Sequence, residues 1–179
     1  EASTVVSAPG LHNVRNALAA SAAATALKVP VMTVAAGLAR FPGIKGRLQR
    51  KACRHGATLI DDTYNANPGS VRAAIAVLAQ LPGPKLLVLG DMGELGPQSA
   101  ALHAEAGARA RAAGVDRLFT LGEFSVHATR EFGAGARHFA CVEDLLAEIE
   151  TALTPDVTML VKGSRFMQME RVVKSFELK

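Results

Sequence analysis

The sequence predicts an α/β fold in which helices precede a doubly wound, mostly parallel sheet with one antiparallel strand. From residue 57 onward, short apolar runs rich in β-branched residues alternate with segments of helical periodicity. Strand–helix–strand repeats need crossover connections, which make neighbouring strands parallel. The turn Arg54–Gly56 is the exception, because it is so short that the two strands beside it must be antiparallel.

The first part of the chain is predicted to be helical. An Ala-rich segment at about 10–27 and a shorter one at about 31–38 favour helices, because Ala is the best helix former. The segment Phe41–Gly46, which contains Pro and Gly, then interrupts the pattern and indicates a domain boundary. We therefore expect two domains, at residues 1–45 and 46–179.

The second domain carries the alternation of strands and helices. Its expected strands lie at about 48–53, 57–62, 85–90, 117–121, 136–140 and 157–161. Its expected helices lie at about 68–80, 97–113, 123–132, 142–153 and 165–176. The helix at 142–153 has the clearest apolar stripe, formed by Val142, Leu145, Leu146, Ile149 and Leu153.

The stretch from Asp61 to Ser70 connects the second expected strand to the helix that follows it. Asn67 is a good N-cap, and Pro68 suits the first helical position because its missing N–H would have no helical partner there. The same turn carries carboxylates, amides and Tyr64, the only tyrosine in the chain. Such a turn is either a ligand-binding loop or a plain turn whose Asp and Asn residues serve its geometry.

Polar groups follow the other strands as well. In an open parallel sheet the carboxyl ends of the strands form one edge, and ligands bind there. The groups expected at this edge are Asp61 and Asp62, Gly90–Glu94, Gly122 and Glu123, and Lys162–Arg165. Each loop alone is explained by the general polarity of loops, but together they predict a binding site.

The composition argues against several classes of function. The net charge of +4 suits a small anionic ligand. Aromatic residues make up only 4% of the chain and no basic run alternates with stacking side chains, so we expect no nucleic-acid partner. The five histidines lack metal-ligand spacing, so no metal site is predicted. No signal-peptide pattern, CxxC motif or membrane span is evident, and we expect a cytoplasmic protein.

Two nucleotide-binding signatures are absent from the sequence. Gly90, Gly93 and Gly96 have the wrong spacing for the dinucleotide fingerprint G-x-G-x-x-G. No segment matches the phosphate-binding loop G-x-x-x-x-G-K-[ST], and Gly43–Gly46 does not fit it. The sequence therefore offers no loop of its own to hold the phosphates of a nucleoside triphosphate.

Five segments occur in the order seen in Mur ligases. They are Gly10–Ala20, Gly46–Gln49, Asp62–Pro68, Leu89–Gly96 and Val161–Arg165. The chain thus resembles the Mur ligase family over nearly all of residues 10–176, and five motifs in one order are more specific than any one of them.

The resemblance implies a parent enzyme with an N-terminal substrate domain, a central ATPase domain and a C-terminal Rossmann-like domain. Residues 1–45 would be the last helices of the central domain, and residues 46–179 would be the C-terminal domain. The phosphate-binding loop, the magnesium ligands and the catalytic core would lie upstream. The resemblance therefore implies that this chain has no catalytic residue and is inactive alone. We also expect a monomer.

The implied reaction is ATP-dependent amide formation for peptidoglycan synthesis, with ATP and magnesium as cofactors. ATP would phosphorylate the carboxylate of UDP-N-acetylmuramoyl-tripeptide, and the amine of D-alanyl-D-alanine would attack the acyl phosphate. This domain would position the reactants, which contributes up to roughly 7–11 kcal/mol when orientation is ideal. Two alternatives stay open: another amide ligase of the superfamily, such as a folylpolyglutamate synthase, and a non-catalytic nucleotide-binding module.

The resemblance also implies which residues contact each ligand. The expected nucleotide contacts are His12, Asn13, Asn16, Arg47 and Asp62. The expected substrate contacts are Tyr64, Asn65, Asn67, Ser164 and Arg165. The alternative role of Ser164 is to cap the last helix, and that of Arg165 is a structural ion pair.

Overall fold

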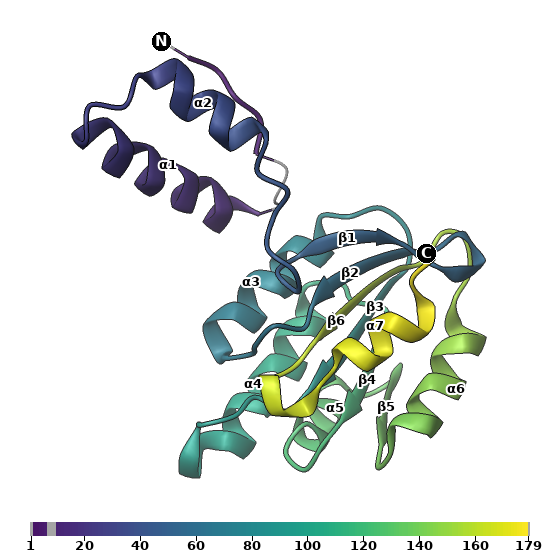
Figure 1. The fold of residues 1–179 in the computed structure, drawn as a ribbon. Helices are drawn as coiled ribbons and strands as arrows, with labels where there is room; N and C mark the ends of the chain where they lie inside the picture. Colours follow the sequence, from purple (N-terminus) through teal and green to yellow (C-terminus); the bar gives the residue numbers. More distant parts are fainter. Residues whose placement is uncertain (1, 7–9, 179) are drawn as a thin grey trace. The chain divides into compact units, whose positions relative to one another are not determined.

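The computed structural model describes residues 2–6 and 10–178, except for the side chains of Leu11 and His12. The chain divides into two compact units, Glu1–Ile44 and Lys45–Lys179. Figure 1 shows the helices and strands of each unit. None of the helices in the described ranges is both long and apolar enough to cross a membrane.

The first unit consists of two helices, α1 (Leu11–Ala26) and α2 (Val31–Ala39), and the segment 2–6. The hydroxyl of Thr4 donates a 3.0 Å hydrogen bond to the carbonyl of Ala35 and so ties that segment to α2. No described residue of α2 is buried. Large apolar side chains of this unit are exposed, namely Val14, Leu18, Leu27, Val31 and Met32. These helices therefore leave much apolar surface uncovered within their own unit.

The second unit is built on a six-stranded sheet of order β1-β2-β6-β3-β4-β5. The strands are β1 (Gln49–Ala52), β2 (Thr58–Asp62), β3 (Lys85–Gly90), β4 (Arg117–Leu121), β5 (Ala136–Phe139) and β6 (Thr158–Lys162). β1 pairs with β2 antiparallel, and every other pair is parallel. The predicted fold class is confirmed, including its single antiparallel strand.

Helices cover both faces of this sheet (Figure 1). α3 (Pro68–Ala79), α4 (Ser99–Ala112) and α5 (Val126–Phe132) pack on one face. α6 (Val142–Ala152) and α7 (Glu170–Phe176) pack on the other. Successive strand residues enter opposite cores, as Leu59 and Ile60 of β2 do. Every residue of the central strand β6 is buried, because helices cover it on both sides.

Close packing of α4 against α5 depends on Gly107. A Cβ atom at this position would lie 2.0 Å from the carbonyl oxygen of Ala128. Glycine lets the two backbones approach, and this contact fixes the start of α5 beside the edge of the sheet where β3 and β4 end.

The local predictions around α3 are confirmed, whereas the helices expected at 123–132 and 165–176 begin later, at Val126 and Glu170. Asn67 caps α3 and Pro68 occupies its first turn. The expected helix at 165–176 is instead a 3₁₀ turn, Arg165–Met167, followed by α7. Gln168 separates them in the left-handed conformation with φ of 50°, and no glycine signals this break in the sequence.

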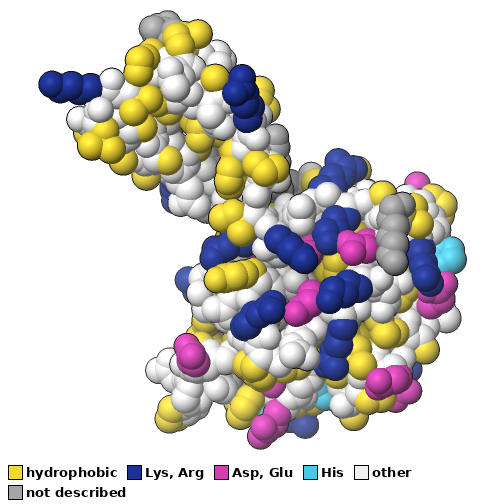
Figure 2. All heavy atoms as spheres, viewed as in Figure 1, with side chains coloured by type: hydrophobic (Ala, Val, Ile, Leu, Met, Phe, Trp, Pro, Cys, Tyr) yellow, Lys and Arg dark blue, Asp and Glu magenta, His cyan; other side chains and the backbone are white. Residues whose placement is uncertain are grey.

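Ion pairs join β1, the first strand of the second unit, to β2 and to the end of the chain. The ammonium of Lys51 on β1 lies 3.2 Å from the carboxylate of Asp61 and 2.5 Å from that of Glu177. Figure 2 shows basic side chains (dark blue) beside acidic ones (magenta) on this face of the unit. Burial lowers the pKa of Lys51, but its hydrogen bonds to Glu177 and Asp61 outweigh that effect and raise it.

Candidate functional site

The carboxyl ends of β2, β6 and β3 lie side by side, because β6 pairs with both of the other strands. These strands end at Asp62, Lys162 and Gly90. The loops after them carry the substrate contacts that the sequence predicted. The fold thus gathers polar groups at one edge of the sheet, as expected of a doubly wound protein.

Asp62 and Lys162 form an ion pair at the centre of this edge. Nζ of Lys162 donates to Oδ2 of Asp62 at 2.7 Å, and Oδ1 of Asp62 accepts the backbone N–H of Leu48 at 3.1 Å. Both side chains are buried. Burial lowers the pKa of Lys162, while the charge of Asp62 opposes the shift. In this arrangement both carboxylate oxygens of Asp62 bind groups of the protein itself.

Arg47 and Tyr64 meet at the surface of the same edge. The guanidinium of Arg47 lies 4.4 Å from the centre of the Tyr64 ring, and both side chains are exposed. A cation over an aromatic face is attracted by the ring, which limits the freedom of the long Arg side chain. Its planar fork of donors suits a phosphate or a carboxylate.

The two asparagines of the β2–α3 loop use their side chains locally. Oδ1 of Asn65 accepts the backbone N–H of Ala66 at 2.8 Å. Oδ1 of Asn67 accepts the N–H of Ser70 at 2.8 Å, and the hydroxyl of Ser70 accepts the N–H of Asn67 at 3.0 Å. The second pair is a capping box, which fixes the start of α3. Both asparagines are exposed, so their amide N–H groups lie at the surface of the loop.

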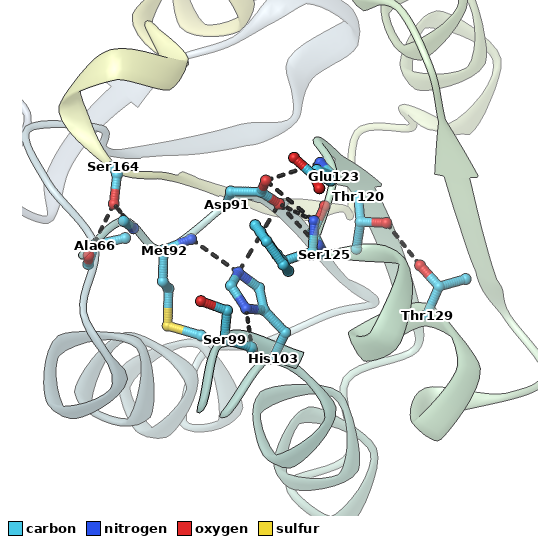
Figure 3. Close-up of polar contacts among 12 residues, drawn as sticks. Ala66, Asp91, Met92, Ser99, His103, Thr120, Glu123, Ser125, Thr129 and Ser164 are labelled. Carbon is cyan, nitrogen blue, oxygen red and sulfur yellow. Dashed lines mark hydrogen bonds and ion pairs between the residues drawn. The ribbon is translucent and has the colours of Figure 1, made fainter. Parts of the chain in front are cut away.

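Ser164 connects the two loops on either side of β6 (Figure 3). Its hydroxyl accepts the backbone N–H of Gly93 at 2.7 Å and donates to the carbonyl of Ala66 at 3.0 Å. It makes no side-chain bond to the turn that follows, so the alternative role as a helix cap is wrong. Arg165 is exposed and pairs with Glu170 at 3.3 Å.

Asp91, directly after β3, is held by a row of backbone donors (Figure 3). Its carboxylate accepts the N–H groups of Glu123 at 2.8 Å, Phe124 at 3.1 Å and Ser125 at 2.7 Å. Three such bonds to one carboxylate make a strong anchor between the loops after β3 and β4. Gly122 leaves room for it, because a Cβ there would lie 2.4 Å from the Asp91 carboxylate.

His103 supports the loop after β3 from within α4. Its Nε2 lies 2.9 Å from the backbone N of Met92, and its Nδ1 lies 2.7 Å from the carbonyl oxygen of Ser99. This pattern fits a ring with its proton on Nδ1, donating to Ser99 and accepting from Met92. The ring is fully buried, so His103 acts on the loop's structure and not on a ligand.

Sequence reasoning listed Asp91 as a polar group of the edge but did not detect its anchoring role, and it missed His103 altogether. A signal for Asp91 was available, since Gly122–Glu123 follows the neighbouring strand and a glycine suits a close approach. No local pattern distinguishes His103 from any other helical histidine, because its partner is a backbone N–H from another element.

The remaining expected contacts lie in the first unit. Asn13 and Asn16 are three residues apart on α1 and therefore share one side of that helix. The side chain of His12 lies outside the described residues. No group of three or more His, Cys, Asp or Glu side chains suited to a metal ion occurs among the residues that the structure describes.

The geometry favours binding and positioning over bond-making. The exposed cations Arg47 and Arg165 are suited to anionic groups of a ligand. The buried groups around them, Asp62, Asp91 and Lys162, are engaged in fixing the loops. Phe166 adds an apolar surface, since it is 66% exposed while its ring lies against Gly93.

The chain resembles known proteins over most of its length. The profile of the family described as "Mur ligase, glutamate ligase domain" matches residues 46–165. The UDP-N-acetylmuramoyl-tripeptide–D-alanyl-D-alanine ligase of Escherichia coli is 41% identical over 94% of the chain. The enzyme of that name from Bacillus subtilis is 36% identical over 92%. The chain spans only 38% of the length of each of these relatives.

Two solved structures that are similar to this chain are also of Mur ligases. A crystal structure of MurF from Acinetobacter baumannii superposes with a TM-score of 0.87 at 36% identity, over 96% of this chain and 38% of that one. MurF ligase from Thermotoga maritima in complex with ADP gives a TM-score of 0.70 at 26% identity, over 78% of this chain and 32% of that one.

Proposed function

This chain belongs to the Mur ligase family, and from that premise we propose that it is the C-terminal part of an ATP-dependent amide ligase. The ligase adds D-alanyl-D-alanine to UDP-N-acetylmuramoyl-tripeptide. One observation carries the proposal: two relatives that bear this name align with 94% and 92% of the chain, at 41% and 40% identity. The enzyme acts as a monomer in the cytoplasm, where ATP is available.

The first unit, in this proposal, is the end of the central ATPase domain, and the boundary lies near Phe41–Gly46. The exposed apolar side chains of α1 and α2 support this role, because such a surface normally packs against further protein. Asn13 and Asn16 contribute to the adenine site there.

ATP supplies the phosphoryl group that activates the tripeptide carboxylate, and this chain helps to hold the nucleotide. Arg47 fits this role because its guanidinium is exposed and oriented by Tyr64. Asp62 fits a direct ribose contact less well, because both of its oxygens bind Lys162 and Leu48. We therefore assign Asp62 to the shape of the nucleotide site, through the segment at Leu48.

Magnesium would be held mainly outside this chain. The described residues offer no cluster of three ligating side chains, and two carboxylates of the edge, Asp91 and Asp62, bind backbone N–H groups and Lys162. In this proposal, the magnesium ligands lie in the central domain of the parent enzyme.

The dipeptide lies, in this proposal, between the loops after β2 and β6. Arg165 binds its carboxylate, while Tyr64 and the amide N–H groups of Asn65 and Asn67 orient its peptide. Ser164 contributes by holding the two neighbouring loops, since its hydroxyl is already both donor and acceptor. The amine is left free to attack the activated carboxylate, so the contribution of this domain is orientation.

The test is a reaction of the purified full-length polypeptide with ATP, magnesium, UDP-N-acetylmuramoyl-tripeptide and D-alanyl-D-alanine, followed by mass spectrometry. We expect the pentapeptide product and one ADP for each amide formed. Omission of the dipeptide should abolish product formation. ADP release with a folate and glutamate, and none with the tripeptide and D-alanyl-D-alanine, would instead identify a ligase of folylpolyglutamate synthase type.

A further inference from the structure

Lys162 is an unusual residue, because lysine is rarely buried completely. Its side chain is only 2% exposed, although it ends the central strand at the binding edge. A buried ammonium is tolerated when it is paired and hydrogen-bonded. Nζ donates to Oδ2 of Asp62 at 2.7 Å and to the backbone carbonyl of Asn65 at 2.8 Å. One side chain thus holds both the end of β2 and the loop beyond it.

The same ion pair reaches the segment through which the chain enters the second unit. We name Gly46–Leu48 the entry segment and Tyr64–Asn67 the substrate loop. Oδ1 of Asp62 accepts the N–H of Leu48 at 3.1 Å, and the N–H of Tyr64 donates to the carbonyl of Gly46 at 3.0 Å. The two segments are therefore cross-linked by backbone and side-chain bonds that converge on the Asp62–Lys162 pair.

The backbone of the entry segment shows how tightly it is held. Leu48 adopts a φ of +49°, a region that is unfavourable for a residue with a Cβ atom. Gly46 has a φ of +72°, and a Cβ atom there would lie 3.0 Å from the backbone N of Tyr64. Such conformations persist when surrounding contacts fix them, and the contacts here are those of Leu48 to Asp62 and of Gly46 to Tyr64.

We propose that Lys162 is a positioning residue, which joins the entry segment and the substrate loop into one rigid element that receives the D-alanyl-D-alanine. Lys162 itself does not touch the ligand, because the Asn65 backbone and Asp62 cover its ammonium. The inference rests on the proposed function, since it identifies the dipeptide as the ligand of the substrate loop. It adds a residue and a connection that the proposed contacts do not include.

Two variants of the full-length ligase separate positioning from simple stability. Lys162→Met removes the ammonium and takes the positive charge of Lys162 away from the buried Asp62 carboxylate, so it should lower both the melting temperature and dipeptide binding. Asp62→Asn combined with Lys162→Met removes both charges, and the amide oxygen at residue 62 can still accept the Leu48 N–H. This double variant should recover most of the melting temperature of the wild type.

The kinetics of the double variant decide the question. We expect its KM for D-alanyl-D-alanine to stay raised by about ten-fold or more, because the Asn65 carbonyl has lost its charged donor. The single variant Asp62→Asn, which keeps Lys162 and its bond to Asn65, is the matched control and should be affected less. Recovery of the dipeptide KM together with the melting temperature would reduce Lys162 to a purely structural role and overturn the proposal.

Hydrogen exchange of the wild type provides a test that needs no variant. Addition of D-alanyl-D-alanine with a non-hydrolysable ATP analogue should slow exchange of the amides of both Tyr64 and Leu48. Slowing at Tyr64 without any change at Leu48 would contradict a single rigid element. If the wild type makes no pentapeptide product, the proposed function is wrong. If the wild type is active but exchange slows at Tyr64 and not at Leu48, only the proposed role of Lys162 is wrong.

Discussion

The carboxylate of Asp91 accepts a 2.7 Å hydrogen bond from the backbone N–H of Ser125, a residue that follows a different strand of the sheet. Glu123 and Phe124 donate to the same carboxylate, so three consecutive N–H groups surround one anion. This contact fixes the loop after β3 against the start of α5. It also explains the glycine at position 122, directly before the three donors, because a side chain there would meet the Asp91 carboxylate.

The first prediction concerns that glycine, Gly122. A Cβ atom there would lie 2.4 Å from the Asp91 carboxylate, and φ is +133°. We expect Gly122→Ala to lower the free energy of unfolding by about 3 kcal/mol or more, since the anchor must move. Gly114→Ala is the control, because Gly114 also has a positive φ, of +76°, but no atom within 4 Å of the added Cβ. It should cost only about 1 kcal/mol. Urea unfolding measures both, and equal losses would refute the anchor.

The second prediction is a pH effect that arises at His138 on β5. Its Nδ1 lies 2.8 Å from the hydroxyl oxygen of Thr120. Burial lowers the pKa of His138 below its ordinary 6.5, Asp91 opposes the shift and Arg130 adds to it. As the pH falls below 6.5, the unfolded chain therefore takes up a proton that the native ring does not. This contribution to stability is present above pH 6.5 and is lost as the pH falls through the folded pKa.

The variant His138→Gln tests this pH dependence. Glutamine keeps a hydrogen-bonding side chain but does not titrate. The melting temperature of the wild type should exceed that of the variant at about pH 8, and the difference should shrink at about pH 5. A difference that is the same at both pH values, in matched buffers, would exclude His138 as the source.

The third prediction concerns Arg47 in the full-length ligase. Arg47→Ala should raise the KM for ATP by roughly 10- to 150-fold, because a hydrogen bond to a charged group contributes about 1.5–3 kcal/mol. Arg50→Ala is the matched control, since Arg50 is an exposed arginine on β1 that contacts Thr58 at 3.4 Å. Steady-state kinetics with ATP varied measure both. Identical ATP kinetics in the two variants would remove Arg47 from the nucleotide site.

The fourth prediction separates the two roles of Arg165. In its pair with Glu170 the arginine side chain is 68% exposed and that of Glu170 only 23%, so solvent reaches the cation and the pair should contribute little to stability. Arg165→Ala should therefore leave the melting temperature nearly unchanged but raise the KM for D-alanyl-D-alanine by about ten-fold or more, with a smaller effect on ATP. Glu170→Gln breaks the same pair and keeps the arginine. If Glu170→Gln raises the dipeptide KM as much as Arg165→Ala does, the ion pair and not the dipeptide explains the effect.

The fifth prediction is that the 179-residue chain is catalytically silent by itself. Its sequence has no phosphate-binding loop to hold the γ-phosphate and magnesium. Phosphate release from ATP, measured with the purified chain, should equal that of a heat-treated sample. Release above that background, lost in the Arg47→Ala variant, would show that the chain itself turns over ATP.

The elements could be predicted from the sequence wherever the signal is local. The cap at Asn67, the first turn at Pro68 and the apolar stripe of α6 depend on neighbours within one or two helical turns. The left-handed Gln168 was not predictable, because a non-glycine residue rarely takes this conformation and its sequence shows no sign of it.

The location of the binding edge could be predicted from the sequence, but the hydrogen bonds and ion pairs within it could not. Alternation of strands and helices indicates that strand ends gather, whereas it does not give the order of the strands. The bonds of Lys162 to Asp62 and of Ser164 to Gly93 exist only because β6 lies between β2 and β3. Residues expected to touch a ligand, such as Asp62 and Ser164, therefore proved to bond to other loops of the protein.

The central position of β6 has a consequence for the newly made chain. β6 is the last strand to be synthesised, yet it lies between β2 and β3. Each of these two strands therefore has one unpaired edge until residue 162 has been added. Contacts across about a hundred residues form slowly, since a long loop must close first. During that interval the unpaired edges of β2 and β3 are exposed to pairing with other chains. The ribosome must therefore finish nearly the whole unit before the binding edge is complete, and an incomplete chain is prone to aggregate.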